Sequence, residues 1–142
     1  MPLVLLCAAL PALAGCESGT LISQEQTCET SGGLLAEGRA TCTGSVGTVR
    51  GSPQLVIVDT DGELDGTYRL EATLSVGKGE TKAHVTAADG DRVGGQVSPG
   101  EPLQISADVE VDDDDEEVVA ELKVAGKEAT DLRYEAELAP PG

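Results

Sequence analysis

The sequence has almost no aromatic residues: among 142 residues, Tyr68 and Tyr134 are accompanied by no Phe and no Trp. Large aromatic side chains supply much of the buried area in most domains. A core in this chain must therefore be built from Val, Leu, Ile and Ala, and it gains little free energy per residue. Both tyrosines fall on the apolar side of their strands, which leaves no aromatic platform for stacking on a sugar ring.

Basic residues are also scarce, with 9 Lys and Arg against 26 Asp and Glu and a formal net charge of −17. Nothing in the sequence offers a basic patch, which argues against a nucleic-acid partner and against electrostatic attraction to anionic lipid. A strongly acidic chain fits a soluble surface domain, a cation binder or a partner for basic ligands.

The usual catalytic motifs are missing. His84 is the only histidine and lies on the polar side of a predicted strand, and the chain has no GxSxG and no glycine-rich phosphate loop. Metal coordination or triad chemistry would need a second histidine or a free cysteine nearby. We therefore predict that the protein is not an enzyme. A carboxylate-based hydrolase is the alternative, and it is disfavoured because nothing in the sequence pairs two acids in distinct environments.

The N-terminus carries an apolar run over residues 3–14 that ends on Leu13-Ala14-Gly15-Cys16. The run has the length of a signal-peptide core and is too short to span a bilayer. These residues resemble a bacterial prolipoprotein signal with its lipobox. The resemblance covers the first 16 residues. It implies that residues 1–15 are removed and that Cys16 carries a diacylglycerol. The exported protein would then be anchored to a bacterial membrane, on its periplasmic or cell-surface face. The alternative is an ordinary secretory signal cut elsewhere, with Cys16 a simple thiol.

The rest of the chain divides by composition. Residues 16–27 are polar and mixed and are predicted to be a tether. Residues 28–139 are long enough for one domain, and residues 140–142 are predicted to be a disordered tail.

Cys28 and Cys42 are predicted to form a disulfide. Cys7 is lost with the signal and Cys16 is lipidated, so these two cysteines remain. Two remaining cysteines in an exported protein are expected to pair, because export places them in an oxidising compartment. The loop that they close is worth on the order of 3 kcal/mol in the chain-entropy model. A redox or metal pair is disfavoured, because the spacing is not CxxC and no histidine is near.

Hydrophobic patterning predicts seven to eight short strands and no amphipathic helix. Five segments alternate apolar and polar residues as half-buried strands do, namely residues 67–76, 81–87, 103–111, 118–124 and 132–138. Less regular strands are predicted at 38–49, 55–58 and 91–97. Two sheets with one wet face each would pack as an antiparallel β-sandwich, immunoglobulin-like or jelly-roll-like. A small β-barrel is the alternative.

The strongest candidate for a cation site is the loop from Asp59 to Gly66. Asp59, Asp61, Glu63 and Asp65 place carboxylates at alternate positions, with glycines that permit a tight turn, as Ca²⁺ requires. The loop is similar to the DxDG core of bacterial calcium loops such as the thrombospondin type 3 repeat, without its second Asp-Gly step. The alternative is a surface turn that uses Asp and Gly for backbone reasons.

Six consecutive carboxylates at 112–117 are predicted to be the solvated tip of a hairpin, because such runs are usually solvated. Taken together, these features predict a lipid-anchored envelope module that binds a protein or glycan partner or serves a structural role, without catalysis or cofactor. A Ca²⁺-dependent domain that binds glycan or peptide is the second hypothesis.

Overall fold

The computed structural model describes residues 19–33, 36–60, 66–111 and 117–140. These residues form eight strands: β1 (Gly19–Gly33), β2 (Ala36–Gly51), β3 (Gln54–Asp59), β4 (Gly66–Ser75), β5 (Lys78–Thr86), β6 (Arg92–Val97), β7 (Leu103–Val111) and β8 (Glu117–Ala139). Within these ranges no helix is long and apolar enough to cross a membrane.

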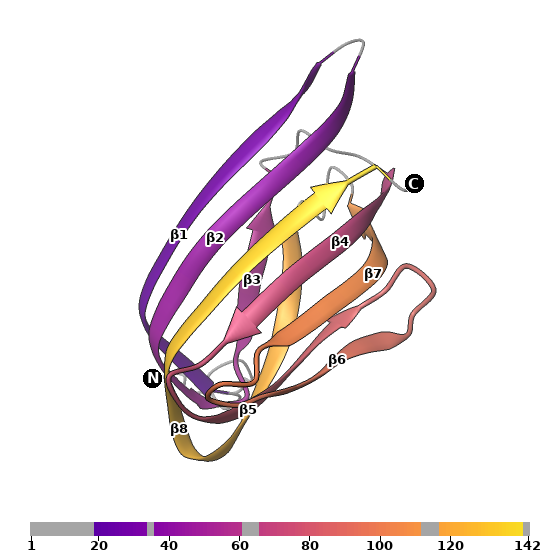
Figure 1. The fold of residues 1–142 in the computed structure, drawn as a ribbon. Coiled ribbons are helices and arrows are strands. Elements are labelled where there is room, and N and C mark those ends of the chain that lie inside the picture. The colour runs from indigo at the N-terminus through magenta and orange to yellow at the C-terminus, as the bar shows by residue number, and fades with distance from the viewer. Residues whose placement is uncertain (1–18, 34–35, 61–65, 112–116, 141–142) are drawn as a thin grey trace, which may run out of the picture.

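The strands pack in two layers, and every pairing is antiparallel (Figure 1). The front layer has the order β1-β2-β8-β4-β7, and the rear layer places β3 and β5 on either side of β8, with β6 beyond β5. The front layer is an open sheet, because its two end strands, β1 and β7, do not pair with each other. The predicted all-β antiparallel sandwich is confirmed. Its strands are not all short, however, since β1, β2 and β8 span 15, 16 and 23 residues.

Strand β8 belongs to both layers. Its first half pairs with β3 and β5, for example Leu122 with Ala83, and its second half pairs with β2 and β4 through Ala136. Between the halves the chain turns at Gly126, whose φ of 89° suits glycine and strains other residues. The sequence Gly126-Lys127, between the alternating segments 118–124 and 132–138, predicts a turn. The structure shows a turn between layers here, with its two arms in different layers (Figure 1).

Two sequence predictions about organisation are wrong. The tether predicted at residues 16–27 is strand from Gly19 onward, because β1 pairs with β2 from Gly19 through Thr27. The sequence Gly77-Lys78-Gly79-Glu80, between the alternating segments 67–76 and 81–87, predicts a hairpin turn, and this hairpin is also absent. Instead, β4 pairs with β7 and β8, while β5 pairs with β6 and β8. The chain passes at Gly77 from the front layer to the rear layer.

The core between the layers is aliphatic, as the composition requires. Its largest fully buried side chains are Leu55, Ile57, Leu70, Leu74, Ile105, Leu132 and Leu138. In β7 and in most of β8 these apolar positions alternate with exposed polar ones, so each layer has one dry face and one wet face. The wet faces therefore carry the polar chemistry of the molecule.

The predicted disulfide between Cys28 and Cys42 is confirmed. The two cysteines are register partners on β1 and β2, with an S–S distance of 2.03 Å and a Cα–Cα distance of 4.1 Å. Strand β1 lies at the edge of the front layer, and among the described strands it pairs through its backbone with β2 alone. The disulfide therefore attaches an edge strand, whose own inner face has little apolar area, to the core.

Tyr134 is the one aromatic side chain in the core, and it lies over Gly44 on the neighbouring strand. A Cβ at Gly44 would fall 2.2 Å from the Tyr134 hydroxyl, so only glycine leaves room for the ring. Gln26 Nε2 donates to the Tyr134 hydroxyl at 2.8 Å and to the Val56 carbonyl at 2.8 Å. Burial raises the pKa of Tyr134, and the hydrogen bond from Gln26 partly offsets the rise. This network joins β1 and β8 to β3 across the sandwich.

Candidate functional site

Most residues of the predicted sites lie outside the described part of the chain. These are Cys16 of the lipobox and Asp61, Glu63 and Asp65 of the calcium loop. Asp59, the remaining predicted ligand, is the last residue of β3 and is partly exposed. Within the described ranges, no group of three His, Cys, Asp or Glu side chains could hold a metal ion. The calcium hypothesis therefore stays a prediction.

The acidic run at 112–117 lies outside the described residues except for Glu117, which is exposed at the start of β8. The strands on either side of the run do not pair with each other. Strand β7 pairs with β4 in the front layer, and the start of β8 pairs with β3 in the rear layer. The prediction that the run is the tip of a β7–β8 hairpin is therefore wrong.

The outer face of the front layer holds a groove of about 410 Å³, which we call the acidic groove. Its carboxylates are Glu71, Glu135 and Glu137, and its neutral side chains include Thr41, Thr73, Gln104 and Ser106. They come from β2, β8, β4 and β7, four strands that are adjacent in the layer. All of these polar side chains lie on the solvent-facing side of their strands. The alternation of apolar and polar residues therefore accounts for the polar lining of the groove.

The register places like charges opposite each other in this groove. Glu71 on β4 is the direct partner of Glu137 on β8, and Thr73 is the partner of Glu135. Like charges directly opposite on neighbouring strands destabilise a sheet. The acidic groove therefore contains a cross-strand pair that folding stability alone would not favour.

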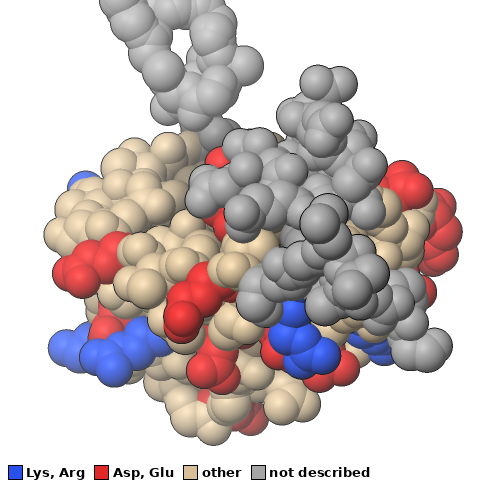
Figure 2. Space-filling model, turned by 90° about the horizontal axis from the view of Figure 1, so that it is seen from above, with Lys and Arg blue, Asp and Glu red and all other residues tan. Residues whose placement is uncertain are grey.

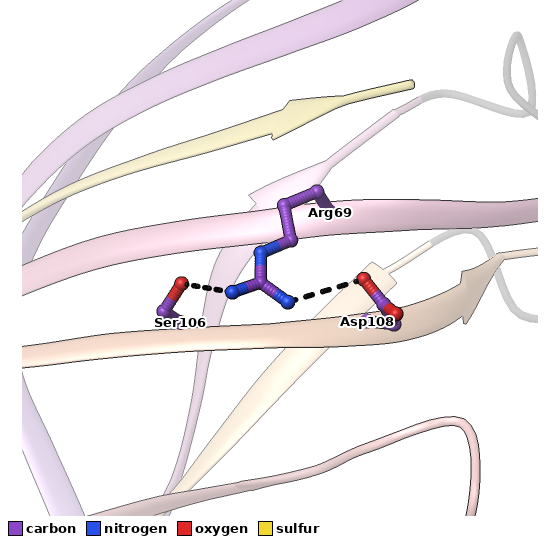
Figure 3. A network of polar contacts seen from close by, with 3 residues as sticks. All are labelled: Arg69, Ser106 and Asp108. Carbon is purple, nitrogen blue, oxygen red and sulfur yellow. Dashed lines mark hydrogen bonds and ion pairs between the residues drawn. The ribbon is translucent and has the colours of Figure 1, made fainter. Parts of the chain in front are cut away.

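Two arginines lie at the rim of the groove. Arg39 Nη1 lies 3.2 Å from Glu137 Oε2. Arg69 on β4 reaches across to β7, where its Nη2 donates to Ser106 Oγ at 2.8 Å and its Nη1 lies 3.3 Å from Asp108 Oδ1 (Figure 3). Within the described residues, neither Glu71 nor Glu135 forms a salt bridge, so both carboxylates are open to a ligand.

The wider surface agrees with the charge of the sequence. Seen from above, acidic side chains are spread over the described surface and basic ones form a few separate groups (Figure 2). The alternation marked Glu71, Glu135 and Glu137 as outward-facing, but sequence reasoning did not select them. The missing signal was the pairing of β4 with β8, because alternation identifies a face and not the neighbouring strand.

No protein-family model matches the sequence, and no curated protein matches it significantly. Among solved structures, the family 11 carbohydrate-binding module of the Clostridium thermocellum cellulase Lic26A-Cel5E is similar, with 9% identity and a TM-score of 0.34. That match covers 83% of each chain. The CBM22-1–GH10 modules of Xyn10B from the same organism share 12% identity at a TM-score of 0.39, over 91% of this chain and 27% of that one.

Plant globulins give similar values. Procruciferin, an 11S globulin from Brassica napus, shares 19% identity at a TM-score of 0.35, and the match covers 72% of this chain. The chain spans 20% of the length of procruciferin. TM-scores this low carry no argument about function, so the function must be argued from the described residues themselves.

Proposed function

We propose that this protein is a non-enzymatic binding module of the bacterial envelope, lipid-anchored at Cys16, whose acidic groove holds a cationic segment of a partner protein. The observation that supports it is the unneutralised pair of carboxylates, Glu71 and Glu135, beside the like-charge pair of Glu71 and Glu137. A cationic ligand would relieve this repulsion on binding. The neutral side chains of the groove, Thr73 and Gln104 among them, can hydrogen-bond the ligand's backbone.

The groove is better suited to binding than to hydrolysis. Acid–base catalysis by two carboxylates requires environments that hold one protonated and the other ionised. Glu71 and Glu135 are both exposed on the same open sheet face, so their surroundings do not separate their roles. Regular strands also hold the lining residues in place, which suits recognition of an extended segment.

Calorimetry with the full chain in detergent tests the groove. A hexalysine peptide should bind, and a hexaserine peptide should not. The double variant Glu71→Gln/Glu135→Gln should weaken hexalysine binding at least about tenfold, equivalent to about 1.4 kcal/mol. The matched control Glu101→Gln/Glu117→Gln removes the same charge from exposed positions outside the groove, and it should change the affinity less than threefold, roughly the context error of such comparisons. Equal losses in both variants would show that net charge alone drives the interaction.

The anchor is tested separately, in cells that make the full chain. Labelled palmitate should enter the protein and should be absent from Cys16→Ala. Incorporation that survives this substitution would remove Cys16 from the proposal and leave the groove unaffected. Export without any labelling would favour the ordinary secretory signal.

A further inference from the structure

A second groove, of about 380 Å³, lies on the outer face of the rear layer. We call it the basic groove, because Lys82, His84, Arg92 and Lys123 line it. Ser52, Gln54, Glu121 and Leu122 complete the lining. It is built from Ser52, the start of β3, the first half of β8, β5 and β6. Of these strands, β8 alone also lines the acidic groove, and it does so through its second half.

Lys82 on β5 and Lys123 on β8 are direct register partners. The chain has only four lysines, and two of them stand opposite each other here. Both are exposed, and neither forms a salt bridge with any residue that the structure describes. As with Glu71 and Glu137, this pairing costs stability and is unexplained by folding alone.

The local charge of the groove is positive even though the chain is acidic. The one carboxylate in its lining, that of Glu121, forms an ion pair with Arg92, with 3.0 Å between Glu121 Oε1 and Arg92 Nη2. That ion pair leaves the two lysine ammonium groups and the His84 imidazole to face a ligand. At physiological ionic strength charges are screened over about 8 Å, so carboxylates beyond that distance act on a bound anion much less than these groups do.

We propose that the basic groove binds a small anion that also carries hydroxyl groups, the class of sugar phosphates and sugar acids. Lys82 and Lys123 would both donate to the anionic group. The Ser52 hydroxyl and the Gln54 amide, on the β3 side, would hydrogen-bond ligand hydroxyls. A volume of about 380 Å³ exceeds what a bare anion needs and lies within the range of about 300–1,000 Å³ for small-molecule sites.

A second copy of the chain is a weaker occupant. Its acidic groove is complementary in sign to the basic groove, which would stack the sandwiches front to rear. However, each added copy brings a formal charge of −17, whereas a sugar phosphate brings about two negative charges. Repulsion between whole chains therefore favours the small anion.

The probes are glucose 6-phosphate, glucuronate, glucose and inorganic phosphate, each titrated into the full chain in detergent by calorimetry. Glucose 6-phosphate or glucuronate should bind, and which one binds separates the phosphate from the carboxylate source. Glucose and inorganic phosphate should bind at least about tenfold more weakly, since each lacks half of the recognised chemistry. Sedimentation at the same concentrations should show no self-association.

The key variant is Lys82→Gln/Lys123→Gln, and its matched control is Lys78→Gln/Lys127→Gln, which removes the same charge outside the groove. The first should weaken binding at least about tenfold, and the second less than about threefold. The single variants Lys123→Gln and Lys127→Gln repeat the comparison should a double variant fail to fold. The proposal is overturned by equal losses in both variants, by no binding of either sugar anion at 10 mM (roughly the weakest useful affinity), or by self-association that Lys82→Gln/Lys123→Gln abolishes.

Discussion

On the front layer Glu71 and Glu137 lie opposite each other across β4 and β8, and on the rear layer Lys82 and Lys123 lie opposite each other across β5 and β8. Glu137 and Lys123 belong to the same strand, separated by the turn at Gly126. A single strand thus supplies an acid to one outer face and a base to the other. The turn between layers keeps the two charged surfaces on opposite sides of the core.

The two faces differ in how their charges are neutralised. Two rim arginines, Arg39 and Arg69, pair with acids on the front face. On the rear face the groove's one carboxylate pairs with Arg92 and leaves both lysines unpaired. In both grooves a like-charge pair occupies positions where we expect a neutral residue to be more stable. Departures of this kind are expected at binding sites.

The largest expected effect comes from removing the disulfide. Because the disulfide lies in the front layer, its loss should affect that layer more than the rear one. Replacing both Cys28 and Cys42 with Ala should lower the free energy of unfolding by about 3 kcal/mol, because the unfolded chain is no longer cross-linked. Denaturant titration measures the loss. Hydrogen exchange should quicken most in β1, at the edge next to the acidic groove, and least in β5 and β6.

The disulfide comparison has two checks. A reducing agent should reproduce the loss in the parent protein and leave the double variant unchanged. Uniformly faster exchange in both layers, with no excess in β1, would contradict the view that the disulfide attaches the edge strand in particular.

A second effect compares one glycine from each layer. Gly44→Ala would place a Cβ 2.2 Å from the Tyr134 hydroxyl and 2.7 Å from the Glu25 carbonyl, so the ring must move. We expect a loss of about 2 kcal/mol in the free energy of unfolding. In Gly95→Ala, on β6, the new Cβ would meet only the mobile end of Leu103 at 3.3 Å, and we expect a change below about 0.5 kcal/mol. Similar losses from the two substitutions would show that Tyr134 packing does not single out Gly44.

A third effect concerns pH and the hydroxyl of Tyr134, which bridges front and rear layers. Tyr134→Phe should cost about 1 kcal/mol, because Gln26 loses an acceptor. Burial raises the pKa of Tyr134, so the folded chain holds the phenolic proton more tightly than the unfolded chain. The resulting stability is complete below about pH 10, where the unfolded tyrosine is protonated, and is lost as the pH rises through the folded pKa.

Urea titrations at a series of alkaline pH values measure this decline, with a limiting slope of about 1.4 kcal/mol per pH unit for one group. Tyr134→Phe should remove that component of the decline, and Tyr68→Phe, at a half-exposed position, should retain it. Parallel pH curves for the parent and Tyr134→Phe would refute the assignment to Tyr134.

Sequence patterning predicted the strands where apolar and polar residues alternate and three less regular strands, which correspond to β2, β3 and β6, but it missed the first part of β1. The sequence of residues 19–27 predicts a tether rather than a strand, because the core-facing side of β1 carries Gln26 and Cys28 in place of a row of aliphatic residues. A disulfide and a side-chain hydrogen bond hold it in place, and neither leaves a periodic signal. The pairing of Cys28 with Cys42 was predictable because the predicted loss of Cys7 with the signal and the predicted lipidation of Cys16 left only these two cysteines.

The grooves were beyond sequence reasoning for a different reason. The alternation placed Lys82 and Lys123 on wet faces, but they are far apart in the chain and meet only because β5 pairs with β8. The hairpin predicted at Gly77 assigned the wrong neighbour to β5. A chain with few basic residues therefore showed no basic patch in its sequence and has a basic groove in its structure.

The smallest expected effect compares the two like-charge pairs directly. Glu71→Gln and Lys82→Gln should each raise the free energy of unfolding by a few tenths of a kcal/mol, roughly the cost of opposed like charges. In 1 M salt, where screening acts over about 3 Å, both gains should vanish.

The two substitutions are not equally informative, because Glu71→Gln also reduces the net charge of an acidic chain. Glu101→Gln, an exposed position outside both grooves, measures that general gain and must be subtracted. Lys82→Gln makes the chain more acidic, so a gain there can come only from relief of the local pair with Lys123. A loss of stability in Lys82→Gln at low salt would mean that the lysines are held by the surrounding carboxylates. The basic groove would then be part of the acidic surface rather than its counterpart.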